Sequence, residues 1–148
     1  MKYLFILVLI CTAFITKAQK YMLLDETISE PAVYTNNLSE MGKYRKYFPV
    51  EVKYLPQFLE VLQKIVNRLD EKSVTGNTKN FQVGCAQFSG RVFPLASGER
   101  IDYILTSDCE GIKVVMHLCD AKLTNANNAY FVKTWIKFIR SNIKRKVK

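Results

Sequence analysis

The sequence predicts an α+β fold, a four-stranded antiparallel meander with N- and C-terminal amphipathic helices packed on one face. Two observations support this. Apolar residues recur at helical spacing in residues 55–72 and again in residues 127–146. The region between them, residues 81–119, is rich in β-branched and aromatic residues and is interrupted by short turns. Each helix has one apolar stripe to bury, so both are expected to cover the same face of the sheet.

Both predicted helices have a recognisable start and a continuous apolar stripe. Pro56 suits the first turn of the helix at 55–72, where its missing N–H is not needed. Asn127 or Asn128 can cap the helix at 127–146. The first stripe consists of Leu55, Phe58, Leu59, Leu62, Ile65, Val66 and Leu69. The second consists of Phe131, Val132, Trp135, Ile136, Ile139 and Ile143.

Four strands are predicted between the helices. They span residues 81–88, 91–95, 100–107 and 112–119, with breaks at 89–90, 96–99 and 108–111. Each break is short enough for a hairpin, so neighbouring strands should pair antiparallel. Pro94 lacks a backbone donor, which makes its strand an edge strand or a bent extension of the first.

The N-terminus has the features of an export signal. Lys2 precedes a thirteen-residue apolar run, residues 3–15, and small residues at Thr16 and Ala18 suit a cleavage site. The run is shorter than the roughly 20 residues that span a bilayer. Cleavage would leave residues 19–148 in the periplasm or outside the cell, without a transmembrane segment, whereas an uncleaved membrane anchor is the alternative. Residues 19–50 show no sustained period and are expected to form a loop-rich arm.

The chain is basic, with a formal net charge of +9. The excess is concentrated in residues 137–148, which could meet an acidic partner, anionic lipid or polysaccharide. The alternative is a solvated helix face with a basic tail. Nucleic acid is not expected as a partner of an exported protein.

Pairing the last two strands brings the reactive side chains together. A register with Leu105 opposite Val114 keeps the apolar residues on one face and puts Asp102 opposite His117. Cys119 then follows two residues beyond His117 on the same face. The carboxylate could orient the imidazole beside the thiol, as in a small secreted thiol-dependent enzyme. The alternative is a structural acid–imidazole pair worth a few tenths of a kcal/mol. The same register sets Tyr103 opposite Met116 and Ile101 opposite Leu118.

Three cysteines remain after the signal. Cys109 and Cys119 would lie roughly 25 Å apart at opposite ends of one hairpin, too far to bond. Cys85 is expected to be a small buried hydrophobe, with a Cys85–Cys119 bridge as the alternative. One histidine and scattered cysteines show no metal-ligand spacing, so no metal and no cofactor are predicted.

The sheet face away from the helices is the predicted binding surface. The alternation places Phe93, Leu95, Ile104 and Val115 there, beside Asp102, Lys113 and His117. The tyrosine-rich arm could instead fold back and cover it. Tyr44 and Arg45, in "GKYRKYF", could add contacts to an acidic partner or a glycan. The leading hypothesis is an exported, non-catalytic binding protein, inhibitor- or immunity-like, that presents this face to a protein or envelope partner. A third hypothesis is a small-ligand carrier with a pocket between sheet and arm.

Overall fold

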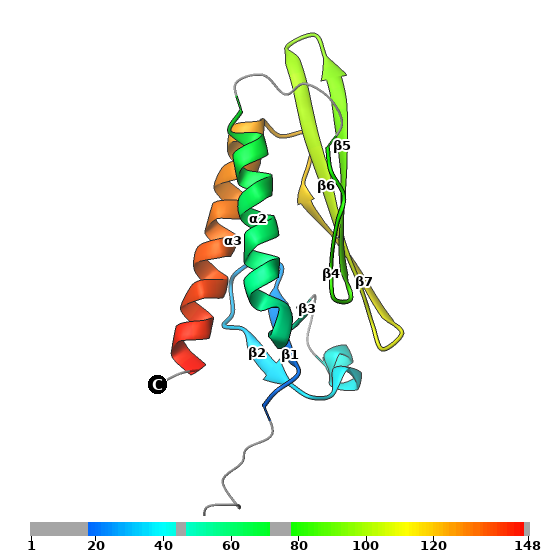
Figure 1. Cartoon of the computed structure of the whole chain (residues 1–148), viewed down its shortest axis with the longest axis vertical. Helices are drawn as coiled ribbons and strands as arrows, with labels where there is room; N and C mark the ends of the chain where they lie inside the picture. Colours follow the sequence, from blue (N-terminus) through cyan, green and yellow to red (C-terminus); the bar gives the residue numbers. More distant parts are fainter. Residues whose placement is uncertain (1–17, 44–46, 72–77, 147–148) are drawn as a thin grey trace, which may run out of the picture.

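The computed structural model describes residues 18–43, 47–71 and 78–146, and its elements form a mixed α+β architecture with two antiparallel sheets (Figure 1). Helices α2 and α3 lie side by side against one face of a four-stranded sheet, β4-β5-β6-β7. A three-stranded sheet, β2-β1-β3, lies near one end of the helix pair. The strands are β1 (Tyr21–Asp25), β2 (Val33–Thr35), β3 (Tyr47–Glu51), β4 (Phe81–Val83), β5 (Ala86–Leu95), β6 (Gly98–Cys109) and β7 (Ile112–Cys119). The helices are α2 (Leu55–Leu69) and α3 (Asn125–Lys146), with 3-10 turns η1 (Leu38–Lys43) and η2 (Val52–Tyr54).

Both predicted helices are confirmed, with small changes at their ends. Helix α2 begins as predicted, with Pro56 in its first turn, and ends at Leu69. Helix α3 begins at Asn125, and the hydroxyl of Thr124 accepts a hydrogen bond from the Asn127 N–H. The expected cap at Asn127 or Asn128 was therefore wrong. The Asn128 amide is buried and bonds both backbone groups of Asp120, which fixes the connection from β7 to α3.

The four-stranded meander is also confirmed, but its first turn lies elsewhere. The chain reverses at Gly84–Cys85, and β5 runs without a break through the predicted turn at 89–90. Gly84 has φ +56°, a conformation that glycine adopts without steric cost. Gly90 serves a different purpose, because a Cβ there would lie 2.6 Å from the Thr78 hydroxyl and 2.7 Å from the Tyr103 ring. This glycine permits a close approach rather than a turn.

The expected loop-rich arm was wrong, because it contributes the three strands of the second sheet. Strand β1 pairs with both β2 and β3, and all five of its residues are buried. Met22 and Leu24 face the main core with both helices, whereas Tyr21 and Leu23 face a smaller cluster that includes Cys109. A strand buried on both faces has no polar alternation, so its sequence lacks the period-2 signal.

A disulfide joins Cys85 to Cys109, with the Cα atoms 5.2 Å apart. The expectation that Cys85 stays unpaired was therefore wrong, and so was the alternative bridge to Cys119. The cause is the position of the first turn. Because Ala86 pairs with Ser107, the residue before Ala86 lies beside the end of β6, and the Asp108 N–H donates to the Cys85 carbonyl.

The described helices include none that is both long enough and apolar enough to cross a membrane. The predicted export signal lies outside the described residues, apart from Ala18.

Candidate functional site

The sheet face away from the helices carries four of the predicted binding residues. Ile104 pairs with His117 and Thr106 pairs with Val115, which places these side chains on that face. We call the side of β4–β7 away from the helices the outer face. The Val115 side chain is 60% exposed in the middle of β7. The other two predicted residues on this face are Phe93 and Lys113.

The second sheet leaves the outer face open. Its inward residues join the core shared by the helices, so it packs beneath them and not across the opposite side of the sheet. The described parts of the chain therefore do not cover Val115 or the neighbouring His117, whose side chain is 64% exposed. The alternative, in which the arm folds back over this face, therefore does not hold for these two residues among the described parts of the chain. Tyr44 and Arg45, which were also predicted to bind, lie outside the described residues.

The end of the β5–β6 hairpin projects beyond its neighbouring strands (Figure 1). Strand β4 pairs only as far as Phe88, and β7 pairing ends at Tyr103. Beyond these points β5 and β6 pair only with each other, and we call residues 90–102 the ribbon. Phe93 and Leu95 stand on its outer side and are 37% and 49% exposed. This extension differs from the predicted break at residues 89–90, through which β5 continues without interruption.

The outer side of the ribbon combines these apolar side chains with positive charge. Arg91 pairs with Asp102, and Phe93 pairs with Arg100, so both arginines share a side with Phe93 and Leu95. Arg91 is exposed and Arg100 is half-buried. Phe93 lies six residues along β5 from the row that contains Val115, about 20 Å away at strand rise. The outer face thus has exposed apolar residues in two places. Phe93 and Leu95 lie at the end of the ribbon, and Val115 lies in the middle of β7.

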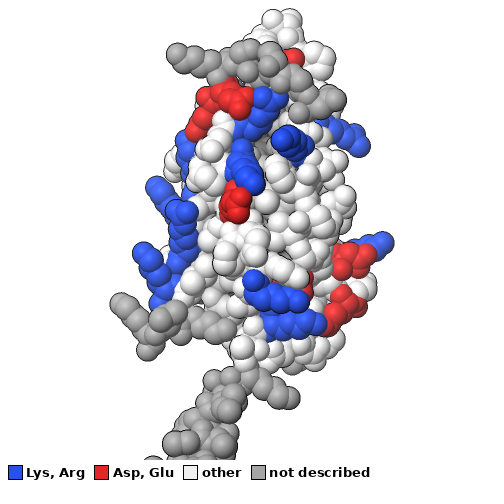
Figure 2. Space-filling model, in the orientation of Figure 1, with Lys and Arg blue, Asp and Glu red and all other residues white. Residues whose placement is uncertain are grey.

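Another concentration of positive charge lies on α3. Figure 2 shows a column of Lys and Arg side chains along the edge that α3 forms. Its exposed basic residues are Lys133, Lys137, Arg140 and Lys144. This column lies on the helical side of the molecule and is separate from the outer face.

The register between β6 and β7 differs by two residues from the predicted one. Leu105 pairs with Met116, because the turn has two residues instead of four. Glu110 and Gly111 form it with φ of 53° and 80°, as a type I′ hairpin requires. A shift of two residues keeps each side chain on its predicted face, so the core assignment survives.

Asp102 and His117 still approach each other on the outer face. They are diagonal instead of opposite, and the Nδ1–Oδ1 distance is 3.7 Å. This distance is too long for a hydrogen bond. Within the described residues the buried Oδ1 of Asp102 has no hydrogen-bond partner. The carboxylate therefore does not hold the imidazole in a fixed orientation.

Cys119 does not share their face. A bulge between Tyr103 and Ile104 leaves Leu118 as an extra residue, and Cys119 pairs with Tyr103 on the core side. The thiol is buried and unpaired. Burial, together with the negative charge of Asp102, raises the pKa of Cys119 to about 12. The thiol is thus protonated at neutral pH, and this geometry does not assemble the predicted nucleophile.

The described residues contain no group of three or more His, Cys, Asp and Glu side chains placed to hold a metal ion. No protein-family model, no curated protein and no solved structure matches the chain significantly.

Proposed function

We propose that this protein is an exported binding module that inserts the β5–β6 ribbon into a cleft of a protein partner. The outer face of the sheet, with Ile104, Val115 and Lys113, extends the contact. The observation that carries the proposal is the exposure of Phe93 and Leu95 at the end of a projecting ribbon. Two-stranded ribbons are marginal on their own, and exposed apolar side chains at such a tip are typical of a surface that a partner covers.

The ribbon also indicates the chemistry of the partner. Fully burying a side chain such as Phe or Leu contributes about 1.5–3 kcal/mol, so an apolar cleft suits Phe93 and Leu95. Arg91 and Arg100 flank them on the same side, and the whole chain carries a net charge of +9. An acidic rim around the cleft would complement these arginines and speed association. We therefore propose a protein partner with an apolar cleft and an acidic rim.

Export is part of the proposal and has two supports. One is the apolar N-terminal run with its small residues at the cleavage position. The other is the Cys85–Cys109 disulfide, since stable disulfides are typical of oxidising compartments outside the cytosol. A periplasmic or extracellular partner is consistent with both.

The test is site-specific photo-crosslinking in the native host. A benzoylphenylalanine replaces Phe93 on the ribbon in one variant and Tyr130 on α3 in another. Tyr130 is a matched control, because it is an aromatic residue that is 75% exposed but lies on the helical side. We expect a discrete protein adduct from position 93 that is absent from position 130. Adding Leu95→Glu to the position-93 variant should abolish the adduct, whereas adding Leu123→Glu should not.

Three results would contradict the proposal. They are no adduct from position 93, equal adducts from both positions, and an adduct that contains two copies of this chain. Leu95 and Leu123 have nearly equal exposure, 49% and 48%, so both substitutions should leave the melting temperature within a few degrees of the parent. A melting curve for each variant separates loss of binding from loss of fold.

A further inference from the structure

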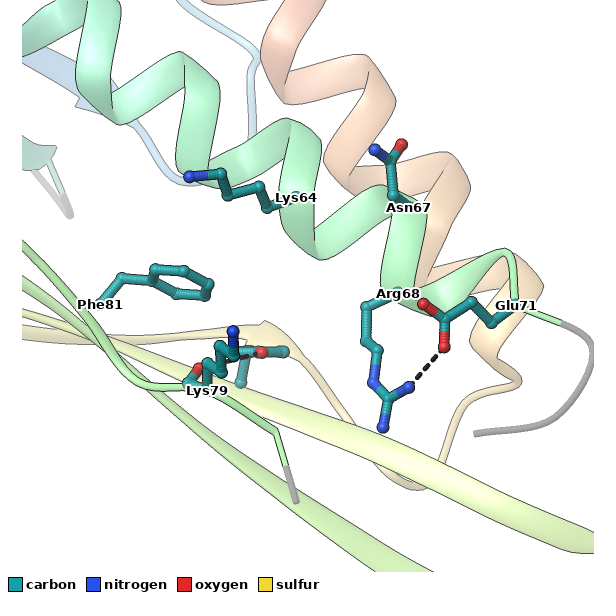
Figure 3. Close-up of a pocket in the computed structure, with 7 residues that line it drawn as sticks. Lys64, Asn67, Arg68, Glu71, Lys79 and Phe81 are labelled. Atoms are coloured by element: carbon teal, nitrogen blue, oxygen red, sulfur yellow. Dashed lines mark hydrogen bonds and ion pairs between the residues drawn. The ribbon is translucent and has the colours of Figure 1, made fainter. Parts of the chain in front are cut away.

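A cavity of about 470 Å³ lies between α2 and the four-stranded sheet, on the helical side and away from the ribbon's outer side (Figure 3). Its volume falls within the range of small-molecule sites, about 300–1,000 Å³. The described residues that line it are Lys64, Asn67, Arg68, Glu71, Lys79, Phe81 and Tyr103.

Three cations and one carboxylate line this cavity. Lys64 and Arg68 are four residues apart on α2, so they occupy the same face of the helix on successive turns. Lys79 comes from the opposite wall, just before β4. Glu71 accepts a hydrogen bond from Arg68, and Lys64 forms an ion pair with Glu60 outside the lining. Among the described residues, the lining and Glu60 together carry one more positive than negative charge, which favours a negatively charged ligand.

The sheet side of the cavity is held in place by specific contacts. The Tyr103 hydroxyl donates to the Lys79 carbonyl at 3.2 Å, and the Gly90 N–H donates to Oδ1 of Asn80 at 3.0 Å. These two bonds fasten the segment before β4 to the neighbouring strands. Gly90 allows this close approach, since a side chain there would collide with Thr78 and Tyr103. The backbone that carries Lys79 is thus positioned without any ligand, and this limits the entropy lost on binding.

Aromatic rings supply the apolar part of the cavity. Phe81 is half-buried and faces the space below Lys64 (Figure 3). Tyr103 is 2% exposed, and burial raises the pKa of its phenol to about 12. A flat apolar group can pack against such rings, and a cation can hold an acidic group beside them.

We propose that this cavity binds a small organic anion in which a carboxylate is attached to a flat apolar body. Lys79 and Lys64 hold the carboxylate, and Phe81 packs against the apolar body. This site is separate from the outer side of the ribbon and does not depend on the protein partner proposed above.

The test is an NMR titration of the ¹⁵N-labelled chain with three probes. The probes are 1-naphthoate, the neutral analogue 1-naphthalenemethanol, and inorganic phosphate. We expect 1-naphthoate to give saturable shifts at the amides of residues 64–71 and 79–81. The neutral alcohol and phosphate should each bind at least fivefold more weakly. Equal binding of the alcohol would overturn the role of the cations, equal binding of phosphate would overturn the apolar part, and no saturable shift would overturn the site.

Charge-matched variants separate the cavity from the overall charge. Lys79→Gln and Lys64→Gln should each weaken 1-naphthoate at least fivefold. Lys137→Gln removes one charge from the exposed side of α3 and should leave the affinity unchanged. An equal loss in all three variants would show that binding follows net charge. All three lysines are exposed, so each variant should keep the parent's amide spectrum outside the changed site.

Discussion

Cys119 shows how one extra residue in a strand changes the chemistry of a side chain. Without the bulge at Leu118, the thiol would stand beside the exposed imidazole of His117. With it, the thiol is enclosed in the core and its pKa is raised to about 12. Nucleophilic attack needs the thiolate, which is scarce at neutral pH under these conditions.

The first prediction follows from this burial. Iodoacetamide at pH 7.5 should label Cys119 in the native protein much more slowly than it labels a free cysteine peptide. Labelling should become fast in 8 M urea, and in a chain without residues 1–18 mass spectrometry should find one modified cysteine until a reductant opens the Cys85–Cys109 bond. Rapid labelling of the folded protein would restore the thiol-enzyme hypothesis.

Asp25 is a buried carboxylate that organises the turn after β1. It accepts hydrogen bonds from the backbone N–H groups of Thr27, Ser29 and Glu30 and from the hydroxyls of Thr27 and Ser29. Burial alone would raise its pKa, but these bonds outweigh burial and lower the pKa to about 2. They also hold Ile28 at φ 59°, an uncommon conformation for a β-branched residue.

The second prediction is a pH dependence of stability. Because the folded pKa lies below the unfolded value, Asp25 stabilises the fold above about pH 4, and this contribution is lost as the pH falls toward 2. Asp25→Asn should lower the free energy of unfolding by about 1–2 kcal/mol at pH 7. The difference from the parent in urea unfolding should shrink between pH 4 and pH 2. A constant difference across this range would contradict the ionic origin, and Glu99→Gln, in an exposed residue, serves as the control.

At the level of elements, two glycines in hairpin turns allow the free-energy cost of backbone strain to be compared with the cost of crowding packed neighbours. Gly84 and Gly111 both have positive φ, 56° and 80°. An added Cβ at Gly111 would meet nothing within 4 Å, whereas one at Gly84 would overlap Glu51 and the Tyr54 ring. Glu51 in turn accepts the Cys85 N–H, so this contact ties the turn to β3.

The third prediction compares these two turns. Gly111→Ala should lower the free energy of unfolding by about 1 kcal/mol through backbone strain. Gly84→Ala should cost about 2 kcal/mol more, because the new methyl group must displace packed neighbours. Chemical denaturation of both variants measures the difference. Equal losses would mean that the contact with Glu51 and Tyr54 yields without cost.

Helices and strands differ, for physical reasons, in how clearly the sequence predicts them. The helices were predicted because each buries one face, so a three- and four-residue period is visible in the sequence. The second sheet was missed because Tyr21 and Met22 are both buried although they face opposite sides. The predicted register between β6 and β7 was wrong because it is set by a two-residue turn at Glu110 and by a one-residue bulge at Leu118. Neither feature changes the apolar pattern of the sequence enough to be predicted from it.

The candidate sites show the same difference between features that follow the apolar pattern and features that depend on a turn or a bulge. Strand alternation was enough to place Ile104 and Val115 on the outer face, and a two-residue error in register leaves alternation unchanged. The disulfide, the ribbon and the inward turn of Cys119 all depend on where a strand turns or bulges. The cavity beside α2 was missed as well, because the sequence does not reveal that Lys64 and Lys79 line the same space.

For the molecule as a whole, the disulfide connects the turn between β4 and β5 to the smaller core cluster on the second sheet. The buried residues of this cluster are Tyr21, Leu23, Leu38, Tyr47 and Cys109. Cys85 lies between β4 and β5, and Cys109 packs in that cluster with Tyr21 and Leu38. The bond closes a segment with a sequence separation of 24 residues, which restricts the unfolded chain by about 3 kcal/mol.

The fourth prediction tests this contribution. The double variant Cys85→Ser/Cys109→Ser should lose about 3 kcal/mol of unfolding free energy. Reducing the parent protein should produce a loss of similar size, and Cys119→Ala is the control for removing a thiol that is not bonded. Urea unfolding with and without reductant provides the measurement. A double variant as stable as the parent would show that the bond adds nothing to this fold.

The positions of Cys85 and Cys109 along the chain also bear on how the protein reaches its folded state. Cys85 lies in the turn between β4 and β5, Cys109 lies at the end of β6, and both precede α3, which begins at Asn125. Under the export proposed above, a chain that emerges N-terminus first from a translocation channel can thus be oxidised while its last helix is still inside. The covalent bond would hold β4, β5 and β6 together during that interval. Trp135 and its neighbours on α3 would arrive last, onto a sheet that is already closed.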